Sequence, residues 1–262
     1  MAIARRRPLV WLAAALACGC LLLWLTPALA LRFALPALAA RAGGAAEPSG
    51  VWPALPFGAS AAHLYLARDA RELALDDLRA VLLPSGPRLD ARVAGGTLLV
   101  RGDDLFGRSG FVRIQGVALE ALSTALATPL ALRGRADGVW RFGASSSVEG
   151  SVTRGALQLS APAPFELPFA ELVVSAARDD ATRDWDVRWV DLQGVQLAGS
   201  AQGRIGADGT LALRAQIRQL EEPVKSFFAL MQLPTGPLPV EIALEGTLAQ
   251  PRLAATAPLA GR

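Results

Sequence analysis

The feature that most constrains the fold of this chain is an alternation of apolar and polar residues with a period of two, which recurs through most of residues 61–262. The clearest examples are 62–67, 186–189, 211–218 and 240–245. Half-buried antiparallel strands produce this pattern, because successive side chains point to opposite faces of a sheet. The sequence therefore predicts a mostly β fold, with about 10–13 strands in a single domain of this length.

Turn and helix signals complete the predicted architecture. Asp137-Gly138 and Asp208-Gly209 lie between alternating segments, where type I′ hairpin turns would use them. After residue 60, only 119–126 and 221–231 have the pattern of helices. We therefore expect a curved, largely antiparallel, many-stranded sheet with two short helices. The pattern leaves open whether this sheet is an open groove or a partly closed barrel.

The N-terminus has the pattern of a membrane anchor. Residues 8–31 contain no charged side chain, and Arg5, Arg6 and Arg7 precede them. Such a run is long enough to cross a hydrocarbon core of about 30 Å as a helix, and its basic flank should stay in the cytoplasm. We predict a single-pass anchor of the bacterial inner membrane in residues 1–32, with the N-terminus cytoplasmic.

The remainder is then expected to lie in the periplasm. Residues 33–60 are rich in Ala, Pro and Gly and indicate a short helix followed by a linker. Residues 61–262 would form the periplasmic β-rich domain. No cysteine occurs after Cys20, so this domain must fold without a disulfide of its own.

Two other interpretations of the N-terminal segment stay open, a cleaved signal peptide and a lipoprotein signal. Ala28-Leu29-Ala30 has the form of a signal-peptidase site, so the segment could be cleaved after Ala30. The apolar run before Pro27 is about 18 residues, longer than the usual signal-peptide core of about 7–15, which favours an uncleaved anchor. Leu16-Ala17-Cys18 resembles a lipidation site, but the residues after Cys18 are too apolar to begin a mature lipoprotein.

The basic balance of the sequence is confined to this N-terminus. The net charge is +3, yet residues 1–32 contain four arginines and no acidic residue, which leaves 22 basic and 23 acidic side chains elsewhere. The near-neutral remainder also lacks aromatic residues interleaved with basic ones, which a nucleic-acid stacking platform would need. We expect no nucleic-acid partner.

The chain has few residues that could perform catalysis. His63, Tyr65 and Lys225 are the only residues of their types. We expect His63 and Tyr65 to share the outer face of one strand. The serines 145–147 lack the G-x-S-x-G context of a hydrolase nucleophile, which disfavours an enzyme that uses Ser146 or His63.

Metal and cofactor sites are not indicated either. Most adjacent carboxylates would point to opposite faces of a strand. Asp184 and Asp186 would share a face if residues 182–190 form a strand, but Arg183 and Arg188 are close enough in the sequence to neutralise them. No calcium-loop spacing or phosphate-binding glycine loop occurs. We therefore predict a protein that is not an enzyme, with no catalytic, cofactor-binding or metal site.

The alternating strands carry more apolar residues than two short helices can cover. An exposed apolar face of this size usually marks a partner or a groove for lipid. A sheet that curls on itself would bury the same face, and the sequence leaves both arrangements open.

Several short sequence segments resemble those of the type II secretion system protein N family. Besides the Arg-flanked anchor, they are LALDDL at 73–78, GGTLLVRG at 95–102, LRGRADG at 132–138 and IALEGTLAQPRL at 242–253. The resemblance implies a non-enzymatic, inner-membrane-anchored periplasmic component of type II secretion, with other secretion-system envelope proteins as partners. More distantly, the chain is similar to AsmA-like envelope proteins. That similarity implies the alternative of lipid binding or transport, with phospholipid acyl chains as ligands.

Overall fold

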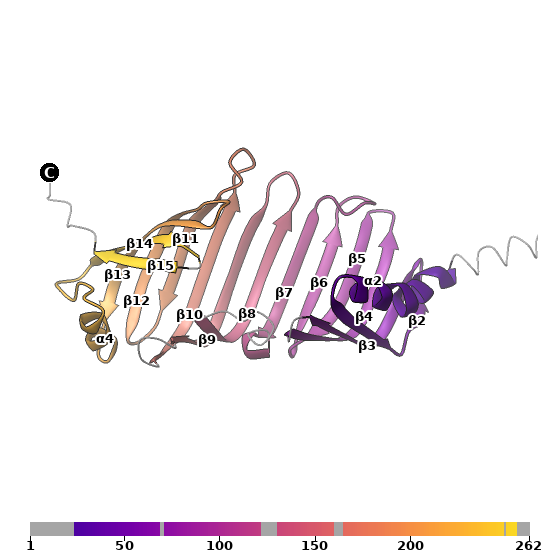
Figure 1. Ribbon diagram of the computed structural model, residues 1–262, viewed down its shortest axis with the longest axis horizontal. Coiled ribbons are helices and arrows are strands. Elements are labelled where there is room, and N and C mark those ends of the chain that lie inside the picture. The colour runs from indigo at the N-terminus through magenta and orange to yellow at the C-terminus, as the bar shows by residue number, and fades with distance from the viewer. Residues whose placement is uncertain (1–23, 69–70, 122–129, 160–164, 249, 256–262) are drawn as a thin grey trace, which may run out of the picture. The chain divides into compact units, whose positions relative to one another are not determined.

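The described residues of the computed structural model are 24–68, 71–121, 130–159, 165–248 and 250–255. They form fifteen strands of one antiparallel sheet, with few short helices (Figure 1). Strands that are neighbours in the sheet are also neighbours in the chain, except that β1 pairs with β3; the short strand β2 also pairs with β3, beside the main path. The prediction of a mostly β, antiparallel, many-stranded fold is confirmed.

The sheet is not closed. Its order runs from β1 to β15 without returning, so each of these two strands ends the order. Of the two arrangements that the sequence left open, the described residues form the open sheet. The chain divides into two compact units, the first up to Val93 together with Leu98–Gly107, and the second from Ala94 to Thr97 together with the residues from Arg108.

Unit 1 contains the helical segment and the first strands. The helix includes residues 24–29, a π-helical turn η1 at Ala30–Ala34 and α2 at Leu35–Arg41. The strands that follow are β1 Gly44–Ser49, β2 Trp52–Ala54, β3 Gly58–Arg68, β4 Arg71–Leu83, β5 Gly86–Val93 and β6 Gly96–Gly102, whose first two residues belong to unit 2.

Unit 2 contains the longer series of strands and one helix. Its elements are β7 Gly110–Ala118, β8 Leu130–Phe142, β9 Ser147–Leu159, β10 Phe165–Arg178, β11 Trp185–Gln193, β12 Leu197–Ile205, β13 Thr210–Leu220, α4 Val224–Leu230, β14 Val240–Thr247 and β15 Gln250–Ala255.

Residues 33–60 differ from the expected short helix and linker. Helix α2 is present, but β1, β2 and the start of β3 occupy most of the remainder. The sequence of β1 is GAAEPS, which has little strand propensity and contains Pro48. Because β1 pairs only with β3, it is an edge strand, where a residue without a backbone N–H is tolerated.

The helix predictions have two outcomes. The predicted helix at 221–231 is confirmed as α4, whose start is stabilised by the Glu222 carboxylate, which accepts hydrogen bonds from the Ser226 N–H and hydroxyl at 3.3 and 2.6 Å. Of the predicted helix at 119–126, residues 119–121 are helical, and 122–126 lie outside the described residues.

One of the two predicted hairpin turns is wrong. Asp137 and Gly138 lie inside the long strand β8 rather than in a turn. Asp208 and Gly209 do lie in the turn between β12 and β13, but only Gly209 has a positive φ, so the turn is not type I′.

In the part of the chain that the structure describes, no helix is both long and apolar enough to cross a membrane. Residues 8–23, which make up most of the predicted anchor, lie outside that part, as does Cys18. The anchor in residues 1–32 therefore stays a prediction.

The core of unit 2 lies where α4 packs on the sheet. Its buried members are Leu167, Ile217, Leu220, Val224, Leu233, Val240 and Ile242. Val224 is 1% exposed and anchors the helix, and the Phe227 ring stacks on that of Phe165 with centroids 5.0 Å apart. Helix α4 thus covers one end of the sheet's apolar side.

Truncating Val224 should destabilise the chain, whereas truncating an exposed residue of the same helix should not. We expect Val224→Ala to lower the free energy of unfolding by about 2 kcal/mol, from the lost burial and the cavity left behind. The matched control is Leu230→Ala, because Leu230 is 67% exposed. Urea unfolding followed by circular dichroism measures both, and equal effects would contradict the packing of α4.

Candidate functional site

One face of unit 2 carries only apolar residues across eight consecutive strands, β7 to β14. Residues opposite each other in an antiparallel ladder share a face, so the registers of the strand pairs identify the set. Its members, which we call the apolar face, are Val112, Ile114, Ala136, Gly138, Trp140, Val148, Gly150, Val152, Leu172, Val174, Ala176, Val187, Val190, Leu192, Gly199, Ala201, Gly203, Leu213, Ala215, Ile217, Val240, Ile242 and Leu244.

The middle of the apolar face is a row of mostly small side chains that crosses all eight strands. In strand order this row, the middle row, is Ile114, Gly138, Gly150, Val174, Val190, Ala201, Ala215 and Ile242. At a spacing of about 4.8 Å between neighbouring strands, it spans about 34 Å. Larger residues flank it on both sides, such as Trp140 and Leu213 on one side and Leu172 and Ile217 on the other. Where both flanking residues are larger, as at Gly138 on β8, Gly150 on β9 and Ala215 on β13, the middle row is the floor of a groove.

The groove is deepest where two glycines face each other. Gly138 on β8 lies opposite Gly150 on β9. A cavity of about 340 Å³ lies over this pair and is lined by apolar side chains of β7 to β10, including Val112, Trp140 and Leu172. This volume is at the lower end of the range found for small-molecule sites. The absence of side chains at the two glycines creates the space.

The apolar face is accessible over most of its length. Seven of the eight residues in the middle row are half-buried, and only Ile242, next to the α4 cluster, is fully buried. Trp140 is 46% exposed at the side of the groove. A ligand without polar groups could therefore contact the row between β7 and β13 without any strand moving.

The opposite face of the same strands is polar. The row adjacent to the middle row reads Asp137, Ser151, Val173, Asp191, Ser200, Gln216 and Glu241. Two ion pairs lie on this face, Arg218 with Asp191 at 2.5 Å and Arg141 with Glu149 at 4.0 Å. A depression of about 600 Å³ on this side is lined by Arg113, Glu149, Glu171 and Trp189, among others. The two faces thus differ sharply in chemistry.

No protein-family model, curated protein or solved structure matches this chain. The interpretation of the site therefore rests on its own geometry.

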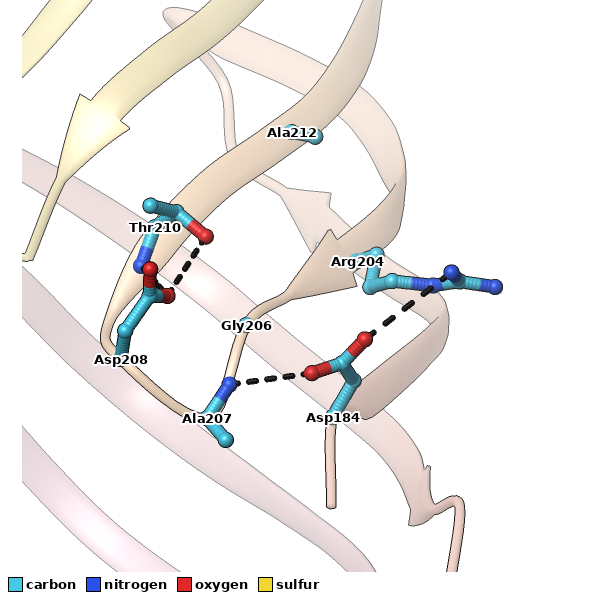
Figure 2. Close-up of a pocket in the computed structure, with 7 residues that line it drawn as sticks. All are labelled: Asp184, Arg204, Gly206, Ala207, Asp208, Thr210 and Ala212. Carbon is cyan, nitrogen blue, oxygen red and sulfur yellow. Dashed lines mark hydrogen bonds and ion pairs between the residues drawn. The ribbon is translucent and has the colours of Figure 1, made fainter. Parts of the chain in front are cut away.

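A second pocket lies at the turn between β12 and β13 (Figure 2). It has a volume of about 340 Å³, but its polar groups bond to one another. The Asp208 carboxylate accepts hydrogen bonds from the Thr210 N–H and hydroxyl at 3.0 and 2.8 Å, which lowers the pKa of Asp208. Asp184 accepts a bond from the Ala207 N–H at 3.0 Å and lies 3.9 Å from an Arg204 nitrogen. These bonds hold the turn together.

The residues singled out as catalytic candidates are not brought together. His63 and Tyr65 share one face of β3 in unit 1, and the His63 side chain is 70% exposed. Its Nδ1 lies 2.7 Å from Oδ1 of Asp76, on the neighbouring strand β4. Ser146 belongs to unit 2, in the turn between β8 and β9, where its backbone oxygen accepts a hydrogen bond from the Arg178 N–H.

Metal ligands are likewise not grouped in the part of the chain that the structure describes. There, no three His, Cys, Asp or Glu side chains come close enough to hold a metal ion. Asp184 precedes β11 rather than lying within it, so it does not form a same-face strand pair with Asp186.

The sequence pattern fails to predict two residues of the middle row. The Asp137-Gly138 pair predicts a turn, although Gly138 lies within β8 in the middle row. On β11, Val187 and Trp189 were expected to share a face, but the register shifts between Val187 and Val190. Trp189 consequently lies opposite Ser175 on the polar face, 53% exposed, and Val190 takes the place on the apolar face.

The polar face should make stability depend on pH. Hydrogen bonds from Gln193 and Arg218 lower the pKa of Asp191 below its ordinary value of 3.8. A carboxyl with a lowered pKa in the folded state adds stability that is present above its ordinary pKa and is lost as the pH falls through the folded-state value. We expect Arg218→Ala to cost about 0.5 kcal/mol at pH 7, the scale of a largely exposed ion pair, and nothing at about pH 2.

Urea unfolding at the two pH values measures this difference. The matched control is Arg214→Ala, on the same strand and face, for which no change with pH is expected. A cost for Arg218→Ala that persists in acid would contradict the role of the Asp191 charge.

Proposed function

We propose that this protein is an inner-membrane-anchored envelope protein that holds the acyl chains of phospholipids along the apolar face of unit 2. The observation that carries the proposal is the middle row, in which eight consecutive strands contribute only apolar or glycine residues, and which is accessible on seven of them, β7 to β13. A soluble sheet that faced only water on this side would not need such a row.

The dimensions of the groove suit a long, narrow, apolar ligand. A hydrocarbon core of about 30 Å contains two layers of acyl chains, so one chain extends about 15 Å. The accessible part of the middle row, from β7 to β13, spans about 29 Å, which is long enough for one such chain laid across the strands. Each methylene removed from water contributes about 0.8 kcal/mol, which is sufficient to hold a chain without any hydrogen bond.

The chemistry of the groove also selects the part of the lipid that enters. Side chains of the apolar face offer no donor or acceptor except the Trp140 indole N–H. A charged headgroup would lose its hydration there without gaining partners, at a high cost in free energy. We therefore place the acyl chains in the groove and leave the headgroup outside, in water.

Photocrosslinking in cells tests this proposal at adjacent residues of one strand. A benzophenone amino acid is introduced at Val174, on the apolar face of β10, or at Val173, its half-buried neighbour on the polar face. We expect lipid adducts by mass spectrometry at position 174 and none at 173. Absence of lipid at 174 in a correctly folded chain would contradict the proposal.

A charge placed in the groove should abolish lipid binding. We expect Ala215→Asp, in the middle row, to reduce lipid adducts at position 174 by at least about tenfold, which corresponds to about 1.4 kcal/mol. The control is Gln216→Asp, the next residue of β13, which is exposed on the polar face. Equal adduct yields from the two variants would show that the groove is not the binding site.

A second candidate function, a component of type II secretion, is favoured by the open edge of the sheet. Among the described residues, β15 is the last strand in the order, so one of its edges has no neighbouring strand. Such an edge can add a strand from another protein through backbone hydrogen bonds. The resemblance to the type II secretion system protein N family implies secretion-system envelope proteins as such partners.

Deletion of the gene tests this second function. We expect the deletion strain to export fewer folded substrates of type II secretion, measured as their enzymatic activity in the medium, with recovery when the wild-type gene is restored. Unchanged export in the deletion strain would contradict it. The lipid proposal is judged separately, by the adducts at position 174.

A further inference from the structure

Unit 1 has a set of large apolar side chains exposed at one end of its strands. They are Trp52, Leu55, Phe57, Leu82, Leu105 and Phe106, each between 46% and 83% exposed, and we call them the rim. Leu55 and Phe57 lie in the turn between β2 and β3, and Leu82 lies near the end of β4. Leu105 and Phe106 are in the loop after β6. None of them belongs to the apolar face of unit 2.

Backbone contacts place these segments at the same end of unit 1. Gly58, the first residue of β3, pairs with Val81 near the end of β4, and the Leu82 N–H donates to the Phe57 carbonyl at 2.8 Å. At the start of β5, Gly86 and Pro87 closely approach Gly102, the last residue of β6. The turn, the β4–β5 hairpin and the loop after β6 therefore form one continuous edge.

The rim is held in place by its own hydrogen bonds. The Arg79 guanidinium donates to the Leu55 carbonyl at 3.2 Å. In the loop after β6, the Phe106 N–H donates to the Asp104 carboxylate at 2.8 Å, and the Gly107 N–H donates to the Asp104 carbonyl at 3.0 Å. The apolar side chains thus project from ordered turns.

Charges near the rim nearly balance one another. The basic residues on these strand ends and loops are Arg79, Arg88, Arg101 and Arg108, and the acidic ones are Asp90, Asp103 and Asp104. A strongly charged partner is therefore not indicated. Exposed Trp, Phe and Leu side chains with nearly balanced charge fit a lipid surface, where they bury in the boundary between headgroups and acyl chains.

The course of the chain brings this end of unit 1 toward a membrane. Residues 8–23 contain no charge, and residues 24–29, which follow them in the chain, are helical. At the other end of that helix, only Ala42 and Gly43 separate α2 from β1, and both η1 and α2 contact β1. The helix thus returns along β1, so its N-terminal end points toward Ser49 and the β2–β3 turn, away from the Arg68 end of β3.

We infer that the rim of unit 1 is a membrane-docking surface, which inserts its six apolar side chains into the lipid layer that the N-terminal segment enters. This inference rests on the anchor of the proposed function, but not on lipid binding by the apolar face. It gives the protein a second contact with the bilayer, beside the anchor itself.

A fluorescent label on the rim of the full chain tests the inference. Cys18 and Cys20 are changed to alanine, and a single cysteine is introduced by Phe106→Cys and labelled with an environment-sensitive nitrobenzoxadiazole dye. The matched control is Val195→Cys in unit 2, because Val195 is 82% exposed and Phe106 is 83% exposed. Each chain is reconstituted into phosphatidylcholine vesicles with bromine-labelled acyl chains, and circular dichroism confirms that both are folded.

We expect the F106C label to emit at shorter wavelength and to be quenched several-fold by the bromolipid, and the V195C label to remain unquenched. Quenching should persist in high salt, because the charges of the rim nearly balance, and at one chain per vesicle. A chain that floats with the vesicles but shows no quenching at position 106 overturns the rim inference alone. A chain that does not float with the vesicles overturns the anchor as well. Quenching that disappears when the protein is diluted to one chain per vesicle assigns the rim to contact with a second copy of the chain instead.

Discussion

The structure of unit 2 depends on the backbone hydrogen bonds that join each strand to the next strand in the chain. Because opposite residues of an antiparallel ladder share a face, the register fixed by one pair of strands determines which residues of the following strand can join the apolar face. Across eight strands this requirement links Ile114 on β7 to Ile242 on β14. A slip of one residue at a strand would place its polar face in the groove, for example Glu149 on β9 or Arg214 on β13, so the groove depends on the register.

Bulges allow the apolar face to continue where the simple alternation fails. The register shifts between Ile114 and Val117 on β7, and again between Val187 and Val190 on β11. In each case two apolar residues three positions apart occupy the same face. At the first bulge the Asp137 carboxylate accepts a hydrogen bond from the Gly116 N–H at 2.9 Å. A polar side chain thus satisfies the backbone group that the bulge removes from the ladder.

The sequence predicts this fold where the strands are regular and fails where the ladder is disturbed. On β13, the expected inward residues Leu211 and Ile217 are buried, and Arg214 and Gln216 are exposed. Trp189 is placed on the wrong face because a bulge leaves no mark in the composition. Gly138 was read as a turn because Asp-Gly pairs favour turns locally, whereas here pairing with β7 and β9 decides. The middle row could not be predicted, because it is defined by the registers of seven pairs of strands.

The apolar face of unit 2 and the rim of unit 1 differ in shape, and the difference implies different ligands. In the middle row, Gly138 and Gly150 lie lower than their flanking residues and a cavity of about 340 Å³ lies over them, so the contact available to a ligand there is concave. At the rim of unit 1, tryptophan, phenylalanine and leucine project from turns, so the contact is convex. A single acyl chain can follow a narrow groove but cannot cover six projecting side chains, whereas a bilayer surface can cover projecting side chains but cannot enter a groove between strands. One lipid environment would thus engage the protein in two physically distinct ways.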